Sequence, residues 1–210
     1  MSVAANIAGI RNQIPESVTL IAVSKTKSEE EILEAYHAGQ RDFGENRVQE
    51  LVPKFEALPK DIRWHLIGHL QSNKVKYIAP FVHMIHSVDS EKLLSEINKL
   101  AAKYNRVIPA LLQVHIAQEE TKFGFSFNEV REVCSRKEQF PNVKIAGLMG
   151  MATNTENLAQ VREEFSGLHS LYMEMQPLST LSMGMSSDWA IAVEEGSTMI
   201  RLGSSIFGSR

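Results

Sequence analysis

Residues 19–39 read TLIAVSKTKSEEEILEAYHAG and contain one complete strand–helix unit. The apolar, β-branched run at residues 19–23 predicts a buried strand. Ser28, with Glu31 three positions later, forms a capping box that predicts the start of a helix, and Gly39 ends that helix. A strand followed at once by a covering helix is the building block of parallel α/β sheets.

The same alternation continues to the end of the chain. Further apolar runs predict strands at residues 41–43, 63–67, 83–87, 108–115, 143–149, 180–183 and 198–202. Helical periodicity follows every one of them but the last, and an extra helix over residues 3–14 precedes the first strand. The chain therefore predicts one α/β domain over residues 1–210, a (β/α)₈ TIM barrel. An open doubly wound sheet is the main alternative, but its glycine-rich first turn is missing at residues 24–27.

Composition narrows the functional class. The chain has 210 residues, 43% hydrophobic and 22% charged, with a net charge of −3, so no basic excess suggests a nucleic-acid partner. The single cysteine, Cys134, excludes an internal disulfide and suits a reducing cytosol. The sequence shows neither a signal peptide nor an apolar span of about 20 residues, so we expect a cytoplasmic protein without a membrane partner.

Barrel sites form at the carboxyl ends of the strands, where this chain is polar. Lys25 follows the first strand, and a lysine amine on the rim of a pocket can form a Schiff base, although a rim lysine can also simply extend into solvent. In a closed barrel the last strand lies beside the first, which brings Arg201 and the turn Gly203-Ser204-Ser205 close to Lys25. We expect no metal site, because the pairs His65/His69 and His83/His86 have poor ligand spacing.

The loops after strands seven and eight of such a barrel often bind phosphate. Glycine lets backbone N–H groups approach the oxyanion, and the serines at 182, 204 and 205 add hydroxyl donors. A lysine amine beside a phosphate site fits pyridoxal 5′-phosphate, which carries both an aldehyde and a phosphate. A different class remains open, a phosphosugar-processing barrel enzyme with Lys25 as an aldolase-type lysine, and it predicts a carboxylate base near Lys25.

Several motifs resemble those of the pyridoxal phosphate homeostasis protein family, which is related to the N-terminal domain of alanine racemase. They are AVSKT (22–26), FGENRVQE (43–50), WHLIGHLQSNK (64–74), KFGF (122–125), LSMGMS (181–186) and IRLGSSIFG (200–208). The resemblance implies a barrel that holds pyridoxal 5′-phosphate as a Schiff base on Lys25, with Arg201 facing the pyridine nitrogen. It implies these cofactor-binding residues: Lys25, Asn46, His65, Met149, Ser182, Arg201, Gly203, Ser204 and Ser205.

Within that set the resemblance assigns the phosphate to Gly203, Ser204 and Ser182, and the ring pocket to Asn46, His65 and Met149. A permanent cation at the ring nitrogen makes the cofactor a weak electron sink. Only nine residues follow Arg201, so we expect no second domain with the further acid/base group that racemisation needs. The expected function is intracellular vitamin B6 homeostasis and cofactor supply by a monomer without turnover, with apo pyridoxal phosphate-dependent enzymes as partners.

Overall fold

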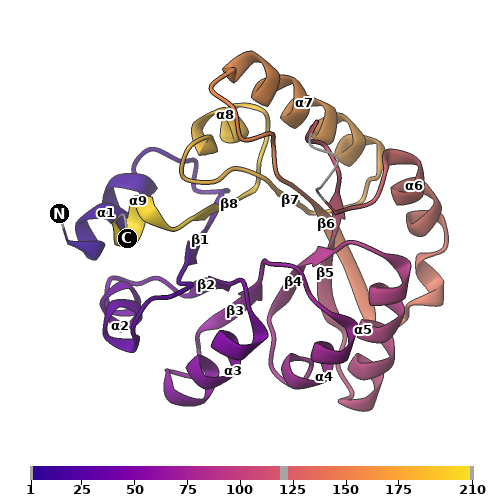
Figure 1. Ribbon diagram of the computed structural model, residues 1–210, viewed down its shortest axis with the longest axis horizontal. Coiled ribbons are helices and arrows are strands. Elements are labelled where there is room, and N and C mark those ends of the chain that lie inside the picture. Colours follow the sequence, from indigo (N-terminus) through magenta and orange to yellow (C-terminus); the bar gives the residue numbers. More distant parts are fainter. Residues whose placement is uncertain (1, 119–122, 209–210) are drawn as a thin grey trace.

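Eight parallel strands close into a barrel in chain order (Figure 1). The computed structural model describes residues 2–118 and 123–208, so Lys122 of the 122–125 motif lies outside it. The barrel closes because β8 (Met199–Leu202) pairs in parallel with β1 (Thr19–Val23), Ile21 lying opposite Arg201. This closure confirms the predicted (β/α)₈ architecture and rules out the open sheet.

The strands lie where the apolar runs predicted them, with ends that differ by up to two residues. The six strands between β1 and β8 are β2 (Asp42–Glu45), β3 (Arg63–Leu66), β4 (Met84–Val88), β5 (Ile108–Val114), β6 (Val143–Gly150) and β7 (Thr180–Ser182). A register shift between Ala110 and Leu111 interrupts the pairing of β5 with β6.

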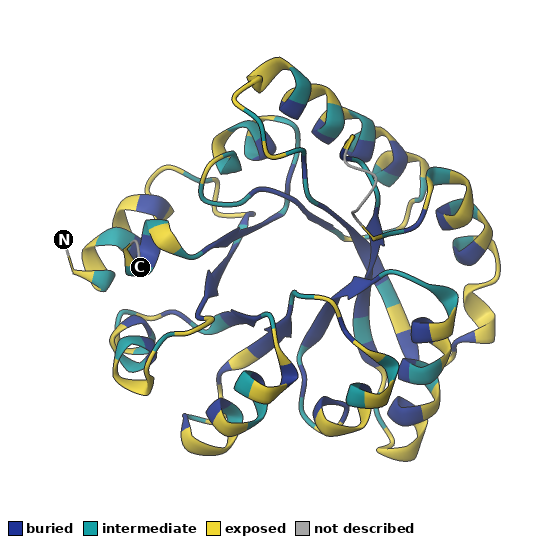
Figure 2. Cartoon of the chain, viewed as in Figure 1, coloured by how far each residue is buried: buried dark blue, intermediate teal, exposed yellow. Residues whose placement is uncertain are grey.

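The described helices surround the barrel and expose their outer faces, whereas the strands are mostly buried (Figure 2). They are α1 (Val3–Arg11), α2 (Glu29–His37), α3 (Val48–Ala57), α4 (Val75–Ile78), α5 (Glu91–Lys103), α6 (Phe127–Ser135), α7 (Leu158–Glu174), α8 (Trp189–Glu194) and α9 (Ser204–Phe207). Short 3₁₀ turns, η1 (Ser72–Lys74) and η2 (Lys137–Gln139), precede α4 and follow α6. None of the helices in the described ranges is long and apolar enough to span a membrane.

Local capping explains where the helices begin and end. The predicted capping box of Ser28 and Glu31 is present at the start of α2, and Gly39 follows that helix with a φ of 90°. The extra N-terminal helix is present as α1, but it ends at Arg11, three residues before the predicted end. It packs beside α9, where the Asn6 side chain donates to the Ile206 carbonyl at 2.8 Å. The N-terminal helix thus supports the segment that follows β8.

Two apolar regions pack on opposite sides of the sheet. The larger one lies between strands and helices and contains the bulky buried residues Trp64, Phe43 and Phe165. The smaller one consists of Ile21, Met84, Leu111, Ala146, Met149 and Met199. Cys134 is partly buried and packs against the larger core, and burial raises the pKa of its thiol, which fits the structural role that a small helical hydrophobe predicts.

Candidate functional site

A cavity of about 700 Å³ opens at the carboxyl ends of the strands, within the roughly 300–1,000 Å³ typical of small-molecule sites. Its wall is built by residues at or after the ends of β1, β2, β3, β6, β7 and β8. The described lining residues are Val23, Lys25, Thr26, Lys27, Asn46, Ile67, Met151, Met185, Ser186, Ser187, Arg201, Gly203, Ser204 and Gly208. This is the face of the barrel where a site was predicted.

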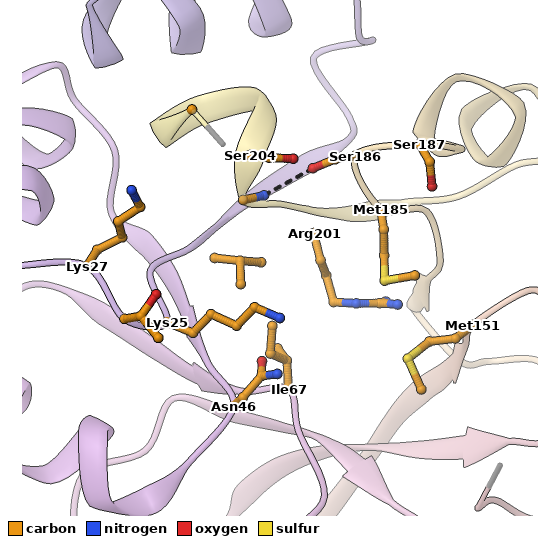
Figure 3. Close-up of a pocket in the computed structure, with 14 residues that line it drawn as sticks. Lys25, Lys27, Asn46, Ile67, Met151, Met185, Ser186, Ser187, Arg201 and Ser204 are labelled. Carbon is orange, nitrogen blue, oxygen red and sulfur yellow. Dashed lines mark hydrogen bonds between the residues drawn. The ribbon is translucent and has the colours of Figure 1, made fainter. Parts of the chain in front are cut away.

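The Lys25 side chain extends into this cavity, toward Ile67 and Asn46 (Figure 3). The next residue, Thr26, has a φ of 63°, a left-handed conformation that costs a β-branched residue on the order of 1–3 kcal/mol. The Thr26 amide donates to Glu50 Oε2 of α3 at 2.8 Å, which holds the turn in place. The backbone therefore turns sharply just after Lys25, and the left-handed Thr26 and its bond to Glu50 fix that turn.

A buried ion pair lies under the same segment. Lys54 Nζ, on α3, donates to Glu45 Oε1 at 2.7 Å and to the carbonyl of Ser24 at 2.8 Å. The Ser24 hydroxyl also donates to Glu45 Oε1, at 2.6 Å. Burial raises the pKa of Glu45, and the hydrogen bonds from Lys54 and Ser24 partly oppose that rise. The residue before Lys25 is thus held by both its backbone and its side chain.

Arg201 forms the floor of the cavity with only 4% of its surface exposed. Its Nη1 donates to Ser182 Oγ at 2.7 Å and its Nη2 donates to the Gly150 carbonyl at 3.1 Å. Burial lowers the pKa of the guanidinium to about 10, so the side chain remains a cation at neutral pH. These two contacts use two of the five N–H groups of a guanidinium, which leaves donors for a ligand.

Serine and glycine form the wall opposite Lys25. The Gly203 amide donates to Ser186 Oγ at 3.4 Å, which joins the loop after β7 to the turn after β8 (Figure 3). Ser204 begins α9 and is exposed at the cavity. Ser186 was not among the predicted binding residues, although it ends the motif LSMGMS and lies in a loop that commonly binds phosphate in barrels.

Five predicted residues line the cavity: Lys25, Asn46, Arg201, Gly203 and Ser204. The other four do not belong to its described wall. Ser205 is partly buried within α9, and Met149 packs in the smaller apolar region inside the barrel. His65 and Ser182 are 1% and 0% exposed and lie behind Arg201.

The difference follows from the strand geometry. Side chains two residues apart along a strand point the same way, and the later one lies nearer the carboxyl end. Ile67 and Met151 therefore occupy the wall positions that were predicted for His65 and Met149. Ser182 is the last residue of β7, and its hydroxyl contacts Arg201 and His86, whereas Ser186, four residues later in the following loop, lines the cavity. His65, Met149 and Ser182 thus lie deeper in the barrel than the described wall of the cavity, and their part in cofactor binding stays a prediction.

The charge of the described wall is positive. Lys25, Lys27 and Arg201 contribute cations, and no Asp or Glu occurs among the lining residues within the described ranges. Lys27 is partly neutralised by Glu31, 2.9 Å away. An aldolase-type site needs a carboxylate base near its lysine, and this part of the wall does not supply one. The donors suit an anionic ligand that carries an electrophile for Lys25.

Comparisons with known proteins identify the family of this chain. Residues 1–210 match the family described as alanine racemase, N-terminal domain. A pyridoxal phosphate homeostasis protein of Aquifex aeolicus is 44% identical over 197 residues, which cover 91% of this chain and 86% of that protein.

Solved structures are also similar. PipY of Synechococcus elongatus PCC7942 is 40% identical, and the alignment covers 99% of this chain and 100% of PipY. The TM-score is 0.94 for PipY without pyridoxal phosphate and 0.90 for PipY with it bound. An alanine racemase from E. faecalis has a TM-score of 0.81 at 16% identity, over 99% of this chain and 58% of that enzyme, a likeness of fold alone.

Proposed function

This chain belongs to the family of the alanine racemase N-terminal domain, and we propose that it binds pyridoxal 5′-phosphate on Lys25 and serves in the homeostasis of that cofactor. The observation that carries the proposal is the meeting of three features in one cavity. These are the Lys25 amine, the buried Arg201 cation and the wall of Ser186, Gly203 and Ser204.

The donor set fits the chemistry of the cofactor. When bound, pyridoxal phosphate supplies an aldehyde that condenses with a lysine amine to a Schiff base and releases water. Lys25 offers the amine inside the cavity, and Val23, Ile67 and Met151 offer apolar walls for an aromatic ring. The cavity volume of about 700 Å³ has room for a ligand of this size.

Each wall has its own part in binding. Ser186 would provide its hydroxyl and Ser204 its backbone N–H group to the phosphate oxygens. The Gly203 N–H group, which donates to Ser186 Oγ at 3.4 Å here, would turn to the phosphate in its place. Asn46, beside Lys25 in the cavity, would contact the ring, and the free donors of Arg201 would hold the ring nitrogen. His65, Met149, Ser182 and Ser205 do not line the described cavity, and we propose that they support the lining residues from within the barrel and α9.

Arg201 also argues for a carrier and against an enzyme. Its guanidinium keeps its proton at neutral pH, so it disfavours a second positive charge on the ring nitrogen. A protonated ring nitrogen makes the cofactor a stronger electron sink for carbanion chemistry, so we infer that Arg201 weakens catalysis on amino acids. We infer a monomeric, cytoplasmic barrel over residues 1–210 that holds the cofactor, supplies it to apo-enzymes and has no turnover of its own.

Absorption spectroscopy tests the binding site. The protein incubated with pyridoxal phosphate is expected to show a Schiff-base band, and borohydride reduction followed by peptide mass spectrometry is expected to mark Lys25. Lys25→Ala should lose both signals and keep its circular dichroism spectrum. Lys76→Ala, an exposed lysine on α4 outside the cavity, is the matched control and should keep them. Labelling of another lysine, or a colourless wild type, would refute the proposal.

The absence of turnover is tested separately. Racemase, transaminase and decarboxylase assays with the loaded protein are expected to give rates no higher than those of free pyridoxal phosphate. A rate well above that background, abolished by Lys25→Ala, would show an enzyme and overturn the carrier function.

A further inference from the structure

A row of five hydrogen-bonded side chains crosses the inside of the barrel. In order, its members are Arg201, Ser182, His86, His65 and Asp42. It begins at Arg201 on the cavity floor, where Nη1 lies 2.7 Å from Ser182 Oγ. Ser182 Oγ lies 3.2 Å from His86 Nδ1, and His86 Nε2 lies 2.9 Å from His65 Nδ1. The row ends at Asp42, the first residue of β2, whose Oδ1 lies 3.1 Å from His65 Nε2.

These residues come from β2, β3, β4, β7 and β8. The strands β4 and β7 are not neighbours in the closed barrel, so the contact of His86 with Ser182 spans the interior. Barrel interiors are usually filled by branched apolar side chains, and a buried polar group is costly unless it is hydrogen-bonded. His65, His86 and Ser182 are 1%, 0% and 0% exposed. Such a row is stable only when every link is satisfied.

The chemistry of the two ends gives the row one direction. A guanidinium can only donate, so Ser182 Oγ accepts from Arg201, and the hydroxyl proton of Ser182 is free for His86 Nδ1. His86 then carries its proton on Nε2 and donates to His65 Nδ1. By the same rule His65 carries its proton on Nε2 and donates to Asp42.

The far end is a fixed acceptor. Although burial opposes ionisation of Asp42, hydrogen bonds from Arg63 and His65 hold the pKa of its carboxyl well below the usual range. Arg63 Nε donates to Asp42 Oδ1 at 2.7 Å, and its Nη2 donates to Oδ2. An ionised carboxylate can only accept, which is what the last link requires.

The opposite direction of proton donation, from His65 to His86 and from His86 to Ser182, is less favourable. It would need His65 to carry two protons, and it would turn the Nδ1 proton of His86 toward Ser182. Ser182 would then face two donors, and its own hydroxyl proton would lose its acceptor. Burial lowers the pKa of His86 well below its usual value, and the Arg201 cation lowers it further, which agrees with a neutral ring.

We propose that Asp42, His65 and His86 are positioning residues for Arg201. Through this row, Asp42 fixes the rotation of the Ser182 hydroxyl, so that Ser182 presents a lone pair to the guanidinium. Arg201 is thereby held with its remaining donors toward the cavity, as preorganised sites require. The effect on pyridoxal phosphate rests on the function proposed above, whereas the proton positions belong to the protein alone.

A metal ion is the competing explanation for part of the row. One ligand atom each from Asp42, His65 and His83 lie within 4.8 Å of one another. Both carboxylate oxygens of Asp42 already accept from Arg63, however, and a metal on His65 Nε2 would displace the proton that this nitrogen donates. The hydrogen-bonded row explains more of the observed contacts.

Nuclear magnetic resonance on the protein without added ligand tests the row. Two-bond ¹H–¹⁵N correlations are expected to show His65 and His86 as neutral rings protonated at Nε2. A ring protonated at Nδ1, or a doubly protonated His65, would refute the proposed direction. A shift of the His65 nitrogens on addition of Zn²⁺ would replace the row by a metal site. None of these outcomes depends on binding of the cofactor.

Two variants at one position test the effect on Arg201. Glutamine at position 86 keeps an acceptor and a donor, so His86→Gln is expected to bind pyridoxal phosphate within about threefold of wild type. His86→Leu removes both and is expected to bind about tenfold more weakly, as loss of a buried hydrogen-bond partner predicts. His83→Gln, beside the ring of His65 but outside the row, is the control.

A double-mutant cycle separates positioning from general damage. In an Arg201→Lys background, His86→Leu is expected to cause no further loss of affinity, because the row would act through the guanidinium. Equal losses in both backgrounds would refute the proposal. If the wild type binds no pyridoxal phosphate, the proposed function fails, and the resonance measurements still decide the row. They also decide it if His86→Leu does not fold.

Discussion

Lys54 Nζ lies 2.7 Å from Glu45 Oε1, and this buried pair supports the backbone of the residue that precedes Lys25. The Glu45 side chain is 0% exposed and that of Lys54 is 11% exposed. Neither residue contacts the cavity, yet both hold the segment from which Lys25 extends. If Lys25 holds the cofactor as proposed, stability and cofactor attachment are coupled at this point of the barrel.

Removal of one partner of this pair is expected to be costly. Lys54→Met should lower the free energy of unfolding by about 3–5 kcal/mol, because it leaves Glu45 buried without its cation. Urea denaturation followed by circular dichroism measures the loss. Lys99→Met is the control, since the pair of Lys99 with Glu96 is exposed and its loss should cost less than about 1 kcal/mol. Similar losses in both variants would contradict the coupling.

The buried His86 is expected to make the protein less stable in mild acid. Burial lowers its pKa in the folded state, so the unfolded chain binds more protons below about pH 6.5. The contribution of the neutral His86 ring to the free energy of unfolding is therefore complete above that pH. Below it, the free energy of unfolding falls by up to about 1.4 kcal/mol per pH unit. The same direction holds for half-buried His83. Denaturation at pH 7.5 and 5.5 measures the slope.

His86→Gln should make that slope shallower, because the variant lacks the buried titrating group. His37→Gln, at the end of α2, is the comparison and should leave the slope near that of wild type. An unchanged slope in His86→Gln would mean that other groups cause the acid sensitivity. The Arg201 cation, which also lowers the pKa of His86, is the same in the comparison variant.

Ser186 is expected to recognise the phosphate rather than the ring. Ser186→Ala should weaken pyridoxal phosphate binding about tenfold, the cost of one hydrogen bond to a charged group. It should leave binding of pyridoxal, which has no phosphate, within about twofold. Titration by absorbance compares both ligands, with Ser170→Ala on the outside of α7 as control. Equal losses for the two ligands would place Ser186 elsewhere in the site.

Glycine at position 147 is required by the packing of neighbouring strands. A Cβ there would lie 1.7 Å from the carbonyl oxygen of Thr180, so Gly147→Ala must displace β6 from β7. We expect a loss of at least about 3 kcal/mol. Gly9→Ala, in α1, where an added Cβ would meet nothing within 4 Å, should gain about 0.5–1 kcal/mol. Thermal unfolding of both variants tests the contrast.

Some details of the fold could not be obtained from local patterns. Asp89, the first polar residue after β4, is a common type of N-cap, but Ser90 caps α5 and the Asp89 carboxylate pairs with His69 Nδ1 at 2.8 Å. Residues 72–78 form the 3₁₀ turn η1 and the short helix α4 in place of one continuous helix. In both cases contacts or packing elsewhere in the chain outweigh a local preference.

The sequence by itself determined the barrel, its strand order and the identity of the chemical groups at its mouth. Alternating apolar periodicity and helix caps are local properties, and closure follows from eight such units. Only the tertiary structure decided how deep each side chain lies. Strands in a barrel are staggered, so the residue that reaches the cavity depends on its level, and Ile67, Met151 and Ser186 reach it where His65, Met149 and Ser182 do not. The row from Asp42 to Arg201 likewise exists only because the closed barrel brings β4 and β7 within hydrogen-bonding distance.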